Sequence, residues 1–397
     1  MIKNKLRDSI RNLFLTQQTN AWRDSLFVFL AGRLLFSAWG VVLWGMGMRL
    51  PQHMEFYYEI EPMVEGWQGA LLGMWQRWDT LHYLRIAIHG YHTEGLTAFY
   101  PLYPLLGRWT AALTGWEPTL ALLVVSNVAF FFSLVLLHKI TARLFSPQLS
   151  QPALIAALIF PFSFYNYAAY PQSLLLLCVL LSYWLAAKGH WSGAALVNLL
   201  GGLTHSTAAL LTILLGWAAV EHIRANRRPL RWAVLAAPFT NFLGIALFLA
   251  YRQAAGWPPY PDTLARLYER SVSFPWEAVV VYFNYIIHLP LQIPYLISWI
   301  GVALFLVTVG LTVWGWSWMP RPLWWYQSSL VVFLMSNTIT GAPMIAFLRY
   351  CLIMFPLFIE IARLWQRPRA RLLLFFLGVI LSLLLSAMFF MWRGDVI

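Results

Sequence analysis

The 397-residue chain has little charge. Asp, Glu, Lys and Arg make up 11% of its residues, against about a quarter in ordinary soluble proteins. None of the four occurs between Arg143 and Lys188 or between Glu277 and Arg321. Each gap is long enough to cross a hydrocarbon core of about 30 Å, which takes ~20 helical residues. With a mean hydropathy of +0.64, this scarcity excludes a soluble enzyme, a disordered chain and a protein with a single membrane anchor.

Cysteine is also scarce. Cys178 and Cys351 both lie in apolar runs, which excludes a disulfide framework, a CxxC motif and a thiolate metal site. What the chain has is apolar residues, 60% of the total, with 17% aromatic residues that include 22 Trp. Such an aromatic content is typical of a protein with belts at both membrane interfaces. The composition therefore predicts an all-α, polytopic membrane protein.

Apolar segments predict roughly eleven membrane crossings. We place them at about 26–48, 118–139, 152–170, 171–187, 191–204, 205–221, 233–251, 292–314, 324–340, 346–363 and 372–391. Pro161, Pro171 and Pro356 predict bends or broken helices, which neighbouring helices make tolerable in a membrane. We see no tandem or inverted repeat, which disfavours a secondary transporter.

The net charge of +12 indicates topology, not binding to nucleic acid. With the N-terminus in the cytoplasm, the inner segments carry seventeen cations and four acids, and the outer segments carry nine cations and eleven acids. Cations are retained on the cytoplasmic side of membrane proteins. The sequence thus predicts a multi-pass protein of the cytoplasmic (inner) membrane whose first long loop faces outward.

The chain divides into two parts. Residues 1–25 place apolar residues at helical spacing among basic ones, which predicts a cytoplasmic amphipathic helix on the inner leaflet, with a disordered basic tail as the alternative. Residues 26–397 are expected to form a single transmembrane catalytic domain. Its long outer loops, at about 49–117 and 252–291, are expected to be functional because loops of this length usually are. The apolar stretch 98–109 is too short to cross and is expected to re-enter or to lie at the interface.

The densest polar cluster lies between residues 77 and 91 in the first outer loop. If this segment is helical, Asp79, His82 and Tyr83 share one face through their spacing. A partly desolvated carboxylate can act as a general base toward a hydroxyl, and Trp78 or Tyr83 can stack on a sugar ring. The alternative is that Asp79 caps an interfacial helix and the rings belong to the aromatic belt.

The residues of this cluster resemble the signature of the PIG-V family, the second mannosyltransferase of glycosylphosphatidylinositol assembly and its bacterial relatives. The matching residues are Trp78-Asp79, His82-Tyr83-Leu84, Ile86-Ala87, Gly90-Tyr91, Glu94 and the run from Ala98 to Leu106. Weaker blocks follow in the family's order at 161–174, 202–206 and 349–358. Gln172 stands where the family commonly has Glu, and His205 where it often has Arg, so donor or acceptor recognition can differ here.

The resemblance implies a GT-C fold with its active site on the non-cytoplasmic side and a polyprenyl-phosphate sugar as the donor. It implies inverting transfer of a hexose, with mannose as the expected sugar, to a lipid-linked or surface acceptor. Asp79 matches the family's first-loop aspartate and is expected to be the catalytic general base. The residues expected to bind substrate are Trp78, His82, Tyr83, Glu94, Gln172, His205 and Arg349.

Other side chains are candidates for roles in the same reaction. Arg349, at the outer end of a crossing, is either a ligand of the donor phosphate or an interfacial anchor. The same two alternatives apply to Arg252. Glu94 is a second candidate acid. Carboxylates suit Mg²⁺ or Mn²⁺, but there is no DxD pair or HExxH motif, and arginine alone can stabilise a phosphate leaving group. We therefore expect no cofactor and a metal-independent reaction.

Two other functions stay open at this point. A lipid or glycan flippase would have the same composition without catalysis, and an assembly factor for another glycosyltransferase would be inert when purified. The expected partners are the polyprenyl-phosphate donor, the glycan acceptor, membrane lipids and a small membrane subunit, with no nucleic acid.

Overall fold

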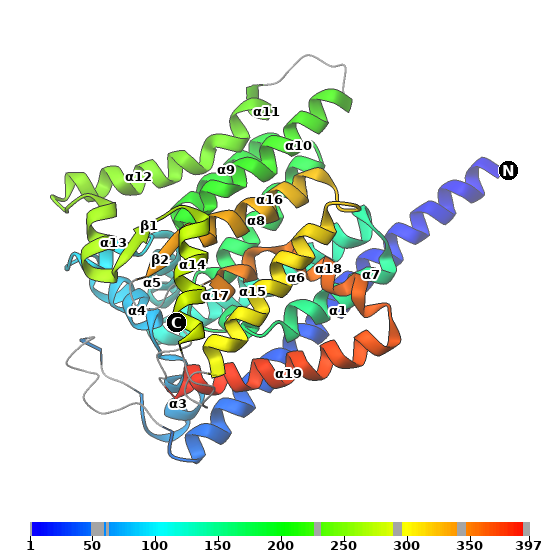
Figure 1. Ribbon diagram of the computed structural model, residues 1–397. Helices are drawn as coiled ribbons and strands as arrows, with labels where there is room; N and C mark the ends of the chain where they lie inside the picture. Colours follow the sequence, from blue (N-terminus) through cyan, green and yellow to red (C-terminus); the bar gives the residue numbers. More distant parts are fainter. Residues whose placement is uncertain are drawn as a thin grey trace.

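The structure is a computed structural model, and it describes residues 2–48, 59–60, 63–225, 232–288, 296–339 and 347–391. Apart from one two-stranded ribbon, the regular secondary structure of the described part is helical (Figure 1). Two long helices, α1 (Ile2–Gly45) and α19 (Pro368–Phe390), run along one side of the molecule. The other long helices lie to one side of this pair, above it in the view of Figure 1. This arrangement confirms the predicted all-α class.

Six helical segments among the described residues are long and apolar enough to cross a membrane. They are Ala21–Gly45 of α1, Pro118–Leu144 (α6), Ser206–Ala225, Trp232–Ala254, Ser298–Gly315 and Pro368–Phe390 (α19). The third comprises η4 (Ser206–Leu210) and α10 (Leu211–Ala225). The fourth comprises α11 (Trp232–Ala236), η5 (Ala237–Phe239) and α12 (Thr240–Ala254), and the fifth lies in α15 (Leu296–Gly315). The chain is therefore a multi-pass membrane protein, but the predicted count of eleven crossings is not shown.

Several predicted crossings are shorter helices. These are α7 (Pro147–Ile159), α8 (Gln172–Ala187), α9 (Trp191–Thr204), α16 (Arg321–Met335) and α18 (Phe355–Trp365). The 13 residues of α7 rise only about 20 Å, which is less than a hydrocarbon core of about 30 Å. Pro161 lies just beyond α7, Pro171 just before α8 and Pro356 in the first turn of α18, which confirms the predicted breaks.

The predicted crossing at 152–170 is not one helix. After α7 the chain passes through the short helix η3 (Ser163–Asn166) and irregular turns before α8 begins. Every residue from Phe160 to Pro171 is buried within the protein. Irregular backbone is tolerated at membrane depth when it is buried in protein, because its polar groups then find partners there. This buried break places Tyr165 and Tyr170 next to the first outer loop.

The two outer loops are folded and meet at one end of the molecule (Figure 1). The first contains α3 (Gly66–Leu71), η1 (Gly73–Trp75), α4 (Asp79–His89), η2 (Gly95–Ala98) and α5 (Leu102–Thr114). The second contains α13 (Tyr260–Tyr268), β1 (Arg270–Val272) and α14 (Pro275–Ile287). β1 pairs antiparallel with β2 (Asn337–Ile339), with Ser271 opposite Thr338. After β2, the described chain resumes with α17 (Phe347–Tyr350) and η7 (Cys351–Ile353).

The turn between α18 and α19, which carries the predicted cytoplasmic arginines, lies at the end opposite the outer loops (Figure 1). α1 is one continuous helix, so the predicted division at residue 25 falls inside it. That division and the orientation of the molecule in the membrane stay predictions.

Glycine allows α9 and α12 to pack closely. A Cβ atom at Gly202 would lie 2.0 Å from the carbonyl oxygen of Asn241, and one at Gly244 would lie 2.3 Å from that of Leu199. Close approach of helix backbones through small residues is typical of membrane proteins, where dispersion contacts drive helix association. The Asn241 side chain also donates to the Ala208 carbonyl at 2.7 Å.

Candidate active site

Asp79 is the first residue of α4, and its backbone is held from two directions. Its amide donates a hydrogen bond to the Tyr170 hydroxyl at 3.0 Å. Two residues earlier, the buried Arg77 donates from Nε to the Phe390 carbonyl at 2.8 Å and from Nη1 to the Gly73 carbonyl at 2.6 Å. The start of α4 is thus tied both to the break before α8 and to the end of α19.

Trp78, immediately before Asp79, has a φ of +55°. A bulky side chain rarely adopts this region, and such strain costs on the order of 1–3 kcal/mol and often marks functional sites. Trp78 occupies the N-cap position of α4, so Asp79 is not the cap. The alternative in which Asp79 only caps an interfacial helix is therefore not supported by its position.

The Asp79 carboxylate is ion-paired with Arg349, which lies 270 residues later in α17. Arg349 Nη1 lies 2.8 Å from Asp79 Oδ2. The Arg349 side chain is 2% exposed and that of Asp79 is 23% exposed, so solvent reaches the carboxylate and not the guanidinium. The structure therefore brings together the two residues that the sequence singled out for proton removal and phosphate binding.

Aromatic rings surround the Arg349 guanidinium. Its central carbon lies 5.7 Å from the ring centre of Tyr165, 5.6 Å from that of Tyr170 and 5.3 Å from that of Tyr350. A guanidinium within about 6 Å of an aromatic face is stabilised by the ring's charge distribution. These rings let a cation remain buried beside a single, partly exposed carboxylate.

A second guanidinium reaches the site from the other outer loop. Arg270, the first residue of β1, lies close enough to Tyr350, Arg349 and Asp79 to interact with them electrostatically. Within the described part of the chain, Asp79 pairs with Arg349, and no carboxylate lies within ion-pair distance of Arg270. The site thus holds one more positive charge than negative, which suits a bound anion.

The two histidines predicted to bind substrate, His205 and His82, both lie near the Asp79–Arg349 pair. His205 Nε2 lies 3.3 Å from the Tyr350 hydroxyl, and its ring stacks on Tyr100 with centroids 6.2 Å apart. His82 stacks on Phe99 with centroids 4.7 Å apart. Burial lowers the pKa of His82 below its usual value, with Asp79 opposing the shift, so His82 is neutral at pH 7.

The remaining predicted residues lie in other surroundings. Tyr83 is buried, with edge contacts to the rings of Phe99, Tyr103 and Tyr170. Gln172 is buried in the first turn of α8, two residues after Tyr170. Their predicted roles in substrate binding are untested by this placement.

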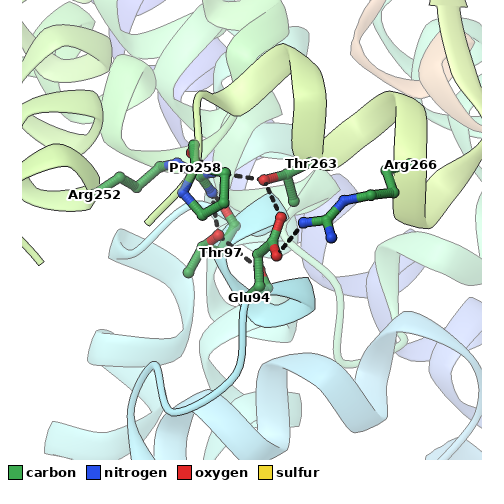
Figure 2. Close-up of polar contacts among 6 residues, drawn as sticks. All are labelled: Glu94, Thr97, Arg252, Pro258, Thr263 and Arg266. Atoms are coloured by element: carbon green, nitrogen blue, oxygen red, sulfur yellow. Dashed lines mark hydrogen bonds and ion pairs between the residues drawn. The ribbon is translucent and has the colours of Figure 1, made fainter. Parts of the chain in front are cut away.

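Glu94 contacts the second outer loop (Figure 2). It accepts a hydrogen bond from Thr263 at 2.8 Å and is ion-paired with Arg266. Arg252 donates to Thr97, to the Pro258 carbonyl and to Thr263 in the same cluster. These partners give Glu94 and Arg252 a role in joining the loops.

No three His, Cys, Asp or Glu side chains cluster as metal ligands within the ranges that the structure describes. Tyr170, Arg270 and Tyr350 were not predicted as site residues from the sequence. Tyr350 and Tyr170 stand inside the blocks that carry the family resemblance, so a signal was present. Arg270 had only the weak signal of a cation in an aromatic outer loop.

No protein-family model matches this chain, and no curated protein shares significant sequence similarity with it. Its fold is similar, over 93% of the chain, to the oligosaccharyltransferase of Archaeoglobus fulgidus tethered with an acceptor peptide, with a TM-score of 0.39 and 11% identity. The same enzyme in complex with zinc and sulfate gives a TM-score of 0.40 and 12% identity. The chain covers 55% and 52% of those two chains, respectively. The similarity is distant, and the PIG-V resemblance gains no support from these comparisons.

Proposed function

We propose that this protein is a membrane glycosyltransferase that transfers a hexose from a polyprenyl-phosphate carrier to a hydroxyl of a lipid-linked or surface acceptor. The observation that carries the proposal is the ion pair between the partly exposed Asp79 and the buried Arg349. The pair supports the proposal because a carboxylate can accept a proton and a guanidinium can bind a phosphate, and sugar transfer from a phosphate carrier requires both groups.

In the proposed reaction, the acceptor hydroxyl attacks the anomeric carbon while Asp79 takes its proton. The bond between that carbon and the phosphate oxygen breaks, and the phosphate leaves with the electron pair. Arg349 compensates the charge on the departing phosphate, with Arg270 as the second cation of the site. Attack opposite the leaving group inverts the anomeric carbon.

The ion pair also suggests when Asp79 becomes active. In the described state the Arg349 guanidinium occupies Oδ2 of the carboxylate, so this oxygen is not free to approach an acceptor hydroxyl. A donor phosphate competes with Asp79 for Arg349, because guanidinium binds phosphate and carboxylate oxygens with the same fork geometry. Donor binding would therefore release Asp79 to accept the proton, so that the base is freed only when a sugar is present to be transferred.

The second candidate is a flippase for lipid-linked sugars. It is favoured by the one extra cation, Arg270, beside the Asp79–Arg349 pair. A flippase moves its substrate without breaking the glycosidic phosphate bond. It therefore needs the anion site and has no use for a proton acceptor, so Asp79→Asn would spare its activity.

The experiment uses purified protein in lipid nanodiscs with radiolabelled polyprenyl-phosphate hexoses and a membrane lipid extract. We expect a labelled product in which the sugar is bound to a new acceptor, and no such product with Asp79→Asn. The matched control is Glu65→Gln, an exposed acid in the same outer loop. Label that stays on the carrier in every reaction would exclude the transferase, and movement of the carrier across the bilayer would then support the flippase.

A further inference from the structure

The segment from α13 through β1, residues 260–272, lies across the short helix η2 of the first outer loop, and we call it the outer strap. Four contacts fasten it there. Thr263 and Arg266 both bind the Glu94 carboxylate. The Tyr260 hydroxyl donates to the Ala98 carbonyl at 3.2 Å, and the Tyr268 hydroxyl donates to the Gly95 carbonyl at 2.8 Å.

Arg252 braces the beginning of the strap from the end of α12 (Figure 2). It is 2% exposed and donates to Thr97 in η2, to the Pro258 carbonyl at 2.8 Å and to the Thr263 hydroxyl at 3.0 Å. Its guanidinium also lies 5.2 Å from the ring centre of Tyr260. Strap, η2 and α12 are thus joined through one buried cation.

The other end of the strap reaches the Asp79–Arg349 pair. After α13 the chain turns at Glu269, which has a φ of +51°, and enters β1 at Arg270. Only four positions separate Arg266, which binds Glu94, from Arg270, which interacts electrostatically with Tyr350 and Arg349. The position of Arg270 therefore depends on how α13 is seated on η2.

We infer that Glu94 is a positioning residue: by fastening the outer strap, it holds Arg270 beside Arg349 as the second cation of an anion site. The inference deepens the proposed function and rests on it for the identity of the anion, a polyprenyl phosphate. Glu94 then acts on donor binding through Arg270 and is not a second base. Arg349 lies in α17, whereas Arg270 lies in the outer strap, which the ion pair of Glu94 with Arg266 helps to fasten.

The first test measures the strap without any sugar transfer. Hydrogen–deuterium exchange is compared for wild type, Glu94→Gln and the control Glu65→Gln in nanodiscs. We expect faster exchange over residues 260–272 in Glu94→Gln alone, because Gln keeps the shape and loses the charge that binds Arg266. Unchanged exchange in that segment overturns the inference.

The second test measures binding of farnesyl phosphate, a short soluble isoprenyl phosphate, by titration calorimetry. We expect Glu94→Gln to weaken binding roughly fivefold, the size expected when an ion pair with one exposed member is lost. In an Arg270→Gln background, Glu94→Gln should add no further loss, since both changes act through the same guanidinium. Additive losses overturn the inference.

Kinetics separate this role from catalysis by Glu94. If Glu94 positions the strap, Glu94→Gln raises the KM for the donor about fivefold and leaves kcat near the wild-type value. A fall in kcat at unchanged KM would make Glu94 a base and overturn the inference. If wild type transfers no sugar, the proposed function fails, while the exchange and binding measurements still decide the role of the strap.

Discussion

Asp79 and Arg349 compensate each other's charge, and this decides how a substitution of either residue will behave. Asn keeps the shape of Asp and cannot accept a proton at neutral pH. We predict that Asp79→Asn lowers kcat for sugar transfer by ~10²–10⁴-fold, the usual contribution of a general base. Steady-state kinetics on monodisperse protein measures this, and turnover like that of wild type would remove Asp79 from the mechanism.

The Asp79→Asn substitution is also expected to change the stability of the protein. Asp79→Asn leaves the buried Arg349 without its counter-charge, and breaking a fully buried pair costs about 3–5 kcal/mol. Because the Asp79 side chain is 23% exposed, we expect a smaller loss, about 1–3 kcal/mol, visible as a lower Tm. The control Asp79→Asn/Arg349→Gln removes both charges, so it should recover Tm but not activity.

At this scale the sequence predicted the kinds of residue better than their contacts. Asp79 was selected from its polar neighbours and Arg349 from its place at the end of a crossing, each separately. Their contact could not be predicted, because it depends on how chain segments 270 residues apart pack together. Glu94 was considered as a second acid from its position beside an apolar stretch. Its actual partners, Thr263 and Arg266, lie about 170 residues further on.

At the scale of elements, the packing of α9 against α12 gives a test of the fold. We predict that Gly244→Ala lowers the free energy of unfolding by about 1–3 kcal/mol, because the new methyl group overlaps the α9 backbone. The matched control is Gly216→Ala in α10, where nothing lies within 4 Å of the added carbon. That change should stabilise by up to ~1 kcal/mol through helix propensity. Equal Tm values for the two variants would contradict the close packing.

The seating of the outer strap should depend on pH. The hydrogen bond from Arg266, and secondarily that from Thr263, lowers the pKa of Glu94 below its usual 4.5. A lowered pKa in the folded state stabilises the strap at every pH above 4.5, and this contribution is lost as the pH falls through the lowered value. We predict constant protection of residues 260–272 between pH 7 and pH 5, and a loss below the usual 4.5. Hydrogen exchange corrected for intrinsic rates measures this.

Glu94→Gln is the control for that titration, because its side chain has no charge to lose. Its strap should exchange at a rate that does not change over the same range of pH. If wild type and Glu94→Gln respond to acid in the same way, another group governs the strap.

The helices and breaks that depend on hydropathy and proline could be predicted from the sequence. The elements that depend on tertiary contacts could not. The long apolar helices α6 and α19 follow from composition, and the broken helices follow from Pro161 and Pro171. The ribbon of β1 and β2 was missed, because three-residue strands have no periodic pattern and pair here over a separation of more than sixty residues. The predicted count of eleven crossings is not shown, because several of the apolar segments form helices shorter than the six that are long enough to cross.

For the molecule as a whole, the charge asymmetry predicts the orientation in the membrane. The outer loops gather at one end and the arginine-rich turn between α18 and α19 at the other (Figure 1). We predict that a membrane-impermeant thiol reagent on intact cells labels a cysteine placed at Glu65 but not one placed at Arg367. Both native cysteines are buried and should stay unlabelled. Labelling at Arg367 alone would reverse the topology and place Asp79 on the cytoplasmic side.

The hydrogen bond from Arg77 to the Phe390 carbonyl has a consequence for biogenesis. The two residues are 313 positions apart, and synthesis of that length takes roughly 15 to 60 s. Throughout this interval the Arg77 guanidinium lacks one of its buried acceptors, so the start of α4 cannot reach its final form. A ribosome that stalls or terminates before α19 would leave a chain with most of its membrane helices made and the segment around Asp79 unanchored. We therefore expect chains truncated before α19 to be inactive and readily recognised by membrane proteases.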